Sequence, residues 1–333
     1  MNKPLLEVKN LVQRFRQTRS LWQELTWSGG KIARRPRFIH AVNGVSFSIG
    51  RGEVFSIVGE SGCGKSTTAR TVIKLLEPYG GEIWFDGTEI TRFDARQMLP
   101  FRRRMQMVFQ NPYASLNPRH TVMRMIAEPM LLHGQAKSRR EAEARVLDLL
   151  DKVGLRSEHA DRFPHQFSGG QRQRLSMARA LATNPEFIIA DEPVSALDVS
   201  IQAQILNLLI DLREEFKLSY LFIAHDLAVV RHISDRVGVM YLGRLVEVGS
   251  RRAVFENPLH PYTRALLAAV PVLGRKKPPQ APLEGDITTA PPDPFAGCVF
   301  SGRCPEVLPV CREAVPEMKS FGTDHWCACH RQE

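Results

Sequence analysis

The sequence lacks any apolar run near the roughly 20 residues that a membrane-spanning helix needs. Its N-terminus, from Met1 to Glu7, has no long apolar stretch and no small-residue cleavage site, so it does not resemble a signal peptide. The sequence also shows no internal repeats. We therefore expect a protein that stays in the cytoplasm and meets a membrane only peripherally.

Acidic residues are too few to balance the basic ones. The 45 Lys and Arg residues exceed the 35 Asp and Glu residues, which gives a formal net charge of +10. Such an excess favours anionic partners: nucleotides, nucleic acids or phospholipids. Between Arg14 and Arg37 the only acid is Glu24, and this stretch is either a solvated loop or a loop close to anionic lipid. Its basic residues are Arg14, Arg16, Arg19, Lys31, Arg34, Arg35 and Arg37.

Cysteine is scarce outside the C-terminal tail. The chain has 6 cysteines, of which Cys63 alone lies far from the tail. In a cytosolic chain such a group indicates a metal site more than disulfides. The tail is too small to bury a core unaided, so a bound metal would also stabilise it. The tail cysteines are Cys298, Cys304, Cys311, Cys327 and Cys329.

From about Leu5 to Gly249 the sequence alternates apolar strand-like runs with amphipathic helices, which predicts an α/β domain with a largely parallel sheet. Three apolar runs are followed by polar residues, at Val54–Val58, Phe187–Ala190 and Tyr220–Ala224. Open α/β sheets bind ligands beyond the carboxyl ends of their strands. We therefore expect these three strands to serve one shared site.

The composition changes after about Asn257. Prolines become frequent, and we expect an extended linker between Lys276 and Pro294, followed by the cysteine group. This change predicts two parts, an α/β domain over residues 1–256 and a C-terminal region over residues 257–333.

A phosphate-binding motif follows the first of the three strands. The run from Gly59 to Thr67 matches G-x-x-x-x-G-K-[ST] between a predicted strand and a predicted helix. Its glycines expose backbone N–H groups to phosphate oxygens, and the helix adds its positive N-terminal end. We expect Lys65 to contact the β- and γ-phosphates and Ser66 to bind Mg²⁺. The candidate nucleotide-binding residues are Gly59, Ser61, Gly62, Cys63, Gly64, Lys65, Ser66 and Thr67. Cys63 itself is more simply a small, half-buried thiol.

Two acids close the second strand. Asp191 can hold Mg²⁺, and Glu192 can act as general base toward the attacking water. Taken alone, the pair would be surface acids that start a turn before Pro193. The phosphate-binding motif earlier in the chain favours the catalytic interpretation.

The segment from Gln166 to Arg174, with the sequence QFSGGQRQR, resembles the signature motif of ATP-binding cassette (ABC) ATPases. Ser168 is suited to cap a helix whose N-terminal N–H groups Gly169 and Gly170 leave open. The resemblance implies that Ser168, Gly169, Gly170 and Gln171 face the ATP of an opposite subunit. It also implies an α/β P-loop ABC ATPase domain, with a mixed sheet core and a helical subdomain, followed by a small cysteine-containing C-terminal extension.

Other elements of this family occur in the expected order. Gln110 resembles the Q-loop glutamine, which the family uses to sense Mg²⁺ and the attacking water. Ser195 and Asp198 resemble the D-loop at the dimer interface, and His225 resembles the switch histidine at the γ-phosphate. The resemblance therefore implies Glu192, His225 and Gln110 as catalytic residues, and Ser66, Gln110 and Asp191 as Mg²⁺ ligands.

The adenine-stacking residue departs from the family pattern, which often has tyrosine near the start of the chain. This sequence offers Phe15, and Arg14 is an alternative because its guanidinium plane can also stack on a base.

The resemblance narrows to the ATPase subunits of bacterial oligopeptide and dipeptide importers. The segments Phe109–Arg119, His165–Gln171 and Asn257–Thr263 carry it. It implies ATP-driven import of di- or oligopeptides, or a related solute, at the cytoplasmic face of the inner membrane. The implied partners are a second, paralogous ABC ATPase subunit, two permeases and an external solute-binding protein, with no nucleic acid. The alternative is a soluble ABC ATPase that acts on nucleic acid or ribosomes and has a metal-binding tail.

Several members of this family hold a four-iron–four-sulfur cluster with tail cysteines at similar positions. The resemblance assigns it to Cys298, Cys304, Cys311 and Cys329, which supply the required four thiolates. Zinc remains an alternative because His325 and His330 are nearby in sequence, and so do unligated thiols. Cys327 departs from the family pattern and could compete with Cys329 as the fourth ligand.

Overall fold

The computed structural model describes residues 3–17, 25–28, 31–34, 38–269 and 296–332. The chain forms two compact units, each drawn from separate stretches of sequence. The first contains Met1–Glu7, Ser48–Val58 and Trp84–Gly238, and the second contains Val8–Phe47, Gly59–Ile83 and Val239–Glu333. The predicted boundary at 256/257 is a different division and stays a prediction. None of the described helices is long and apolar enough to cross a bilayer.

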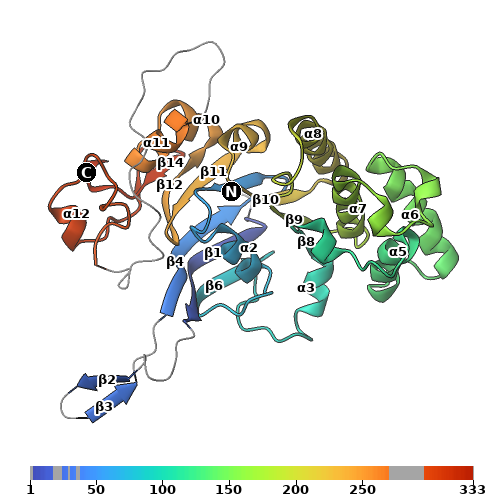
Figure 1. The fold of residues 1–333 in the computed structure, drawn as a ribbon, viewed down its shortest axis with the longest axis horizontal. Coiled ribbons are helices and arrows are strands. Elements are labelled where there is room, and N and C mark those ends of the chain that lie inside the picture. The colour runs from blue at the N-terminus through green and yellow to red at the C-terminus, as the bar shows by residue number, and fades with distance from the viewer. Residues whose placement is uncertain (1–2, 18–24, 29–30, 35–37, 270–295, 333) are drawn as a thin grey trace. The chain divides into compact units, whose positions relative to one another are not determined.

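The first unit is built on four parallel strands in the order β5-β10-β9-β8 (Figure 1). In β5, β9 and β10 every residue is buried, as expected for strands covered on both faces. The register places Ala224 beside Val58, and Ile223 beside Asp191. These three strands therefore end at the same edge of the sheet, and the shared site that we expect there stays a prediction. Their bounds are β5 Val54–Val58, β8 Met105–Val108, β9 Phe187–Asp191 and β10 Ser219–Ala224.

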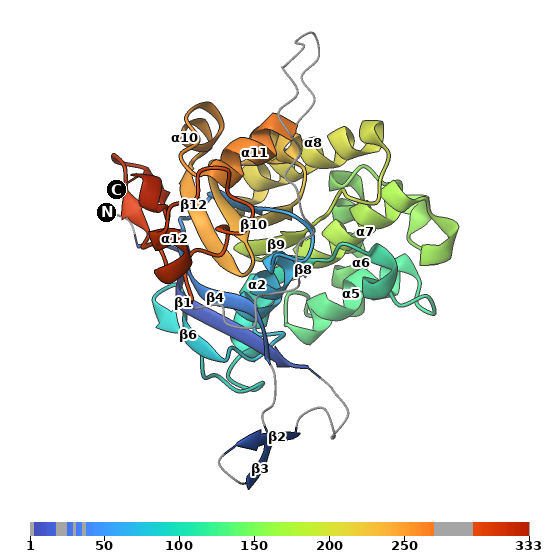
Figure 2. The same cartoon turned by 60° about the vertical axis from the view of Figure 1, so that its left-hand side comes forward.

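Helices account for most of the remaining first unit. In both views α5, α6 and α7 lie together beside β8, and α7 also contacts α8 (Figures 1 and 2). Ser138 caps α6, where its side chain accepts a hydrogen bond from the N–H of Glu141. The bounds are α3 Leu99–Arg104, α4 Pro112–Ser115, α5 Val122–Leu132, α6 Arg139–Lys152, α7 Gly169–Leu181, α8 Val199–Phe216 and α9 Leu227–Ile233, with the short strand β7 at Thr88–Glu89.

The second unit contains shorter helices and antiparallel pairs. Strand β1 lies between β4 and β6, and β14 pairs antiparallel with both β12 and β13. The basic N-terminal stretch, expected to be a loop, contains the hairpin β2–β3, while the predicted linker over 276–294 lies outside the described residues. The bounds are β1 Leu6–Arg16, β2 Leu25–Ser28, β3 Lys31–Arg34, β4 Phe38–Ile49, α2 Lys65–Val72, β6 Gly80–Phe85, β11 Arg236–Tyr241, β12 Arg244–Ser250, α10 Arg251–Glu256, α11 Pro261–Ala269, α12 Val310–Glu313, β13 Lys319–Ser320 and β14 His325–Cys327.

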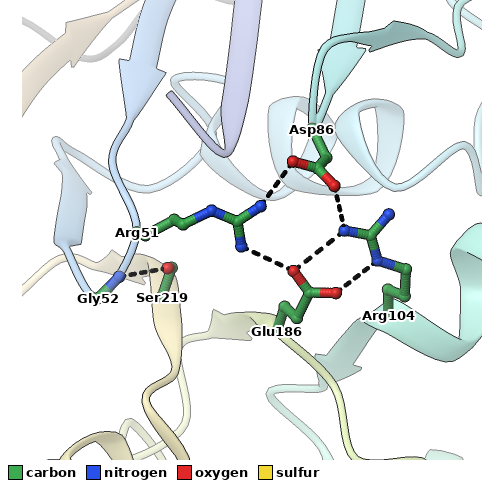
Figure 3. Close-up of polar contacts among 6 residues, drawn as sticks. All are labelled: Arg51, Gly52, Asp86, Arg104, Glu186 and Ser219. Atoms are coloured by element: carbon green, nitrogen blue, oxygen red, sulfur yellow. Dashed lines mark hydrogen bonds and ion pairs between the residues drawn. The ribbon is translucent and has the colours of Figure 1, made fainter. Parts of the chain in front are cut away.

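An ion-pair network lies at the opposite ends of the parallel strands, where β5, β9 and β10 begin (Figure 3). Arg104 bridges Glu186, at 2.5 and 3.0 Å, and Asp86, at 2.6 Å. Arg51 contacts the same two carboxylates, at 2.8 Å from Glu186 and 2.6 Å from Asp86. The hydrogen bonds from Arg104 lower the pKa of both carboxyl groups. The network thus joins four segments that are distant in sequence.

Replacement of Arg104 by glutamine should lower the free energy of unfolding by about 1 kcal/mol at pH 7, a modest value because water screens these partly exposed charges. Since both carboxyl pKa values are lowered in the folded chain, the stabilisation is complete above about pH 5 and disappears as the pH falls through the lowered values. Denaturant unfolding of wild type and Arg104→Gln at pH 7 and pH 3 measures both effects.

The matched control is Arg139→Gln, which removes one exposed pair with Glu143 on α6. It should lose no more than about 0.5 kcal/mol. An Arg104→Gln penalty that stays the same at pH 3 would show that the carboxylates are not its cause.

Candidate functional site

Glu192 directly follows β9 and has an unusual backbone conformation. Its φ is 47°, in the left-handed region that residues other than glycine seldom adopt. Its N–H donates to the carbonyl of Ile223 at 2.9 Å, which ties it to the end of β10. Such strain persists where surrounding contacts impose it, and it is concentrated at functional sites. The main-chain contact therefore fixes the position from which the Glu192 side chain extends.

The Glu192 carboxylate meets two side chains from neighbouring strand ends. One of its oxygens, Oε2, accepts a hydrogen bond from Nε2 of Gln110 at 3.0 Å and lies 3.1 Å from Nδ1 of His225. The Glu192 side chain is 12% exposed, whereas that of His225 is 48% exposed. The structure thus brings the three predicted catalytic side chains together, and their catalytic roles stay predictions.

A small cavity of about 40 Å³ adjoins the carboxylate. This volume exceeds what one water molecule needs. Glu192, Ser195 and His225 line it together with apolar residues such as Val194 and Val229, so a water there would lie beside a candidate base. Asp191, the last residue of β9, is fully buried.

The predicted D-loop residues differ in their surroundings. Ser195 Oγ donates to the carbonyl of Glu192 at 3.1 Å and lies 3.4 Å from Gln110 Nε2. Asp198, at the start of α8, makes no side-chain cap, and the following Val199 is 82% exposed. Ser195 therefore belongs to the carboxylate cluster, while Asp198 faces outward beside an apolar side chain.

The signature segment starts α7 as the sequence predicts. Ser168 Oγ accepts from the N–H of Gln171 at 3.3 Å, and the Gln171 side chain accepts from the N–H of Ser168 at 3.0 Å, so the two form a capping box. A Cβ on Gly170 would lie 2.6 Å from a side-chain carbon of Ile201, so a larger residue would force that side chain to shift. An open hollow of about 510 Å³ lies beside Gln171, with Arg156, Arg162 and Arg174 on its wall.

The phosphate-binding motif lies in the second unit as a loop that ends in α2. Gly64 has a φ of 110°, and a Cβ there would lie 2.1 Å from the carbonyl of Ala41, so only glycine fits. Lys65 Nζ donates to the carbonyls of Gly59 and Glu60, at 2.7 and 2.9 Å. Cys63 is buried, which raises the pKa of its thiol and agrees with a packing role.

Phe15 and Arg14 lie on β1 in different environments. The guanidinium of Arg14 stacks on the rings of Tyr79 and Phe38, at 3.4 and 4.3 Å from their centroids. Phe15 is 40% exposed. Phe15 therefore offers an exposed ring for adenine stacking, whereas the guanidinium plane of Arg14 is already stacked on two other rings.

Sequence reasoning missed Glu60, which lies inside the phosphate-binding loop. Its N–H donates to Tyr262 Oη at 3.0 Å, and its carboxylate contacts Arg303 at 2.8 and 3.3 Å. Both partners lie in the C-terminal region, in segments singled out only for family resemblance or for cysteines. No local pattern could have found these contacts, because they join residues about 200 positions apart or more.

The tail thiols gather in the second unit. The N–H of Cys298 donates to the carbonyl of Cys311 at 2.8 Å. Burial, with smaller contributions from the nearby thiols of Cys311, Cys329 and Cys304, raises the pKa of the Cys298 thiol to about 11. Within the described part of the chain, no three His, Cys, Asp or Glu side chains are arranged to hold one metal ion.

The two histidines weighed as zinc ligands have other partners. His325 Nε2 lies 2.7 Å from the buried carboxylate of Glu247, and His330 Nε2 lies 3.0 Å from the carbonyl of Ala314. Burial raises the pKa of the Cys327 thiol, which lies on β14.

Two family models match the chain. The ABC transporter model matches residues 42–195, which include the phosphate-binding loop, the signature segment and Glu192. The model of the oligopeptide/dipeptide transporter C-terminal region matches residues 246–311, which include Tyr262 and Arg303.

Curated relatives agree with both models. The chain is 52% identical over 305 residues to the oligopeptide transport ATP-binding protein AppF of Bacillus subtilis, covering 90% of this chain and 92% of the relative. It is 46% identical over 330 residues to the putative oligopeptide transport ATP-binding protein YkfD of the same organism, covering 98% and 95%. The glutathione import ATP-binding protein GsiA of Escherichia coli K12 is 54% identical over 286 residues, covering 85% of this chain but 44% of that longer relative.

Solved ABC cassettes have the same fold. The ATP-binding cassette MJ0796, solved as a dimer in a post-hydrolysis state with ADP and phosphate, has a TM-score of 0.64 and 30% identity, covering 74% of this chain and 99% of its own. CbiO1 of Clostridium perfringens, part of the ABC transporter complex cbiONQ, has a TM-score of 0.63 and 27% identity, covering 77% and 92%. The predicted fold class, an α/β P-loop ABC ATPase with a helical subdomain, is confirmed.

Proposed function

The chain belongs to the ABC transporter family, and from this premise we propose that it hydrolyses ATP to power the import of di- or oligopeptides, or of a related solute. The observation that carries the ATPase assignment is the contact of the Glu192 carboxylate with Gln110 and His225 at the strand ends. Peptide as the solute is supported by the C-terminal region model and by two relatives named for oligopeptide transport. No observation favours action on nucleic acid or ribosomes.

Nucleotide binding is assigned to the phosphate-binding loop. Backbone N–H groups of the loop and the ammonium of Lys65 supply the positive charge that ATP phosphates require. The exposed ring of Phe15 is proposed to stack on adenine.

Mg²⁺ is assigned to Ser66, Gln110 and Asp191. They offer hydroxyl, amide and carboxylate oxygens, the donors that this ion prefers, so the donor set fits. When bound, the ion neutralises negative charge on the phosphates.

Hydrolysis is assigned to Glu192 as general base. A water in the adjoining cavity gives a proton to the Glu192 carboxylate while the oxygen of that water forms a bond to the γ-phosphorus. The bond from that phosphorus to the bridging oxygen breaks, which releases ADP and phosphate. Gln110 and His225 contact the same carboxylate oxygen and so orient it toward the water.

The chain is proposed to act as one half of an ATPase dimer. Ser168 and Gly169 are exposed at the start of α7, and Val199 exposes an apolar side chain beside Asp198, as a contact face requires. We propose that the signature residues of this chain contact the ATP bound by the facing subunit. We also propose that the D-loop of this chain lies at the interface between the two subunits. The remaining proposed partners are two permeases and an external solute-binding protein, with the chain at the cytoplasmic face of the inner membrane.

The C-terminal region, residues 257–333, is proposed to hold a four-iron–four-sulfur cluster on Cys298, Cys304, Cys311 and Cys329. Four thiolates are the usual ligands of such a cluster. The hydrogen bond from the N–H of Cys298 to the carbonyl of Cys311 supports the proposal because it brings two of these four residues together. Cys327 is assigned to packing.

The Glu192→Gln variant should bind ATP with an affinity near that of wild type but lose at least 100-fold in turnover, because the amide cannot accept the proton. ATP binding and phosphate release, measured on the purified chain, check both parts. Glu214→Gln on the exposed face of α8 is the matched control and should keep wild-type turnover. Wild-type hydrolysis by Glu192→Gln would contradict the base assignment.

Anaerobically purified protein should contain about four irons per chain and be brown. Cys311→Ser should lose this iron, whereas Cys327→Ser and Cys63→Ser should keep it, as measured by iron analysis and visible absorbance. Colourless, iron-free wild-type protein would contradict the proposed cluster. Loss of iron in Cys327→Ser would show that Cys327, and not only the four assigned cysteines, is needed to bind it.

A further inference from the structure

Each polar group of Glu60 makes a hydrogen bond, and together these bonds connect the phosphate-binding loop to the C-terminal region. Its carbonyl accepts a hydrogen bond from Lys65 Nζ at 2.9 Å. Its N–H donates to Tyr262 Oη, and its carboxylate binds Arg303. The residue that holds the phosphate-contacting lysine is thus itself held by two side chains from another part of the chain.

The geometry of the Arg303 contact fixes the orientation of the Glu60 carboxylate relative to the guanidinium. Both terminal nitrogens of the guanidinium reach the carboxylate, Nη1 to Oε2 at 2.8 Å and Nη2 to Oε1 at 3.3 Å. The side chains are 12% and 22% exposed, so water screens the pair only in part. A two-pronged pair of this kind sets the orientation of both groups, which a lysine could not reproduce.

The Tyr262 contact rests on a buried aromatic cluster. Tyr262 is fully buried, and its ring packs against Tyr241 at 4.7 Å and Phe300 at 5.4 Å between centroids. Phe300 is also fully buried and, like Arg303, belongs to the segment between Cys298 and Cys304. The hydroxyl that receives the Glu60 N–H therefore has little freedom to move.

We propose that Arg303 and Tyr262 are positioning residues that set the affinity of the phosphate-binding loop for ATP by holding Glu60. This inference rests on the proposed ATPase function and extends it to the C-terminal region. Movement of Glu60 would shift the carbonyl that binds Lys65 and the neighbouring N–H groups, and near-ångström displacements at a phosphate site weaken binding.

The test is titration of a fluorescent ATP analogue, with Mg²⁺, into purified full-length chain. Arg303→Gln and Glu60→Gln should each weaken binding about tenfold, the usual effect of losing a charge-assisted hydrogen bond. The double variant should be no weaker than either single variant, because both remove the same contact. Arg264→Gln is the matched control: it breaks an ion pair with Glu306 in the same region and should bind like wild type.

Tyr262→Phe keeps the buried ring and removes only the hydroxyl, so it decides the question even where Arg303→Gln does not fold. It should weaken binding about threefold at a temperature where the variant is still fully folded, because the Glu60 N–H loses its acceptor. Wild-type affinity in Tyr262→Phe and Glu60→Gln, or additive losses in the double variant, would overturn the inference alone. Failure of the wild-type chain to bind the analogue would instead overturn the ATPase function on which it rests.

Discussion

The hydrogen bond from the Glu192 N–H to the Ile223 carbonyl is the contact on which the candidate catalytic cluster depends. It joins the ends of two adjacent parallel strands and fixes Glu192 in a left-handed conformation. Gln110 and His225 reach the same carboxylate oxygen because β8 and β10 end at the same edge as β9. The chemistry of the site thus follows from strand register, since each strand contributes one polar residue just past its buried part.

A second constraint acts on the phosphate-binding loop. Glycine at position 64 lets the loop approach the backbone of Ala41, but glycine alone leaves such a loop free to move. The contacts of Glu60 with Tyr262 and Arg303 restrict that freedom from the C-terminal region. Because Arg303 is next to Cys304 in the chain, the cysteine group and the phosphate-binding loop are joined by a short path of covalent and ionic bonds.

Local chemistry explains why much of this could be predicted from sequence. Ser138 and Ser168 cap helices through contacts three residues away, and the buried strands are continuous apolar runs. Long-range contacts explain what was missed: nothing near Glu60 indicates Arg303, and nothing near His325 indicates its partner Glu247. The basic N-terminal stretch was expected to be a loop because charge suggests solvation but says nothing of strand pairing, and it contains a hairpin. The joining of phosphate-binding loop and strand-end carboxylates into one site concerns both units and stays a prediction.

The most direct test of the account is to purify the tagged chain from membranes solubilised in mild detergent and to identify the proteins that accompany it by mass spectrometry. The account predicts two permeases and a second ABC ATPase subunit in stoichiometric amounts. Recovery in the soluble fraction with ribosomes or DNA, and without permeases, would contradict the transport function and leave only the ATPase chemistry.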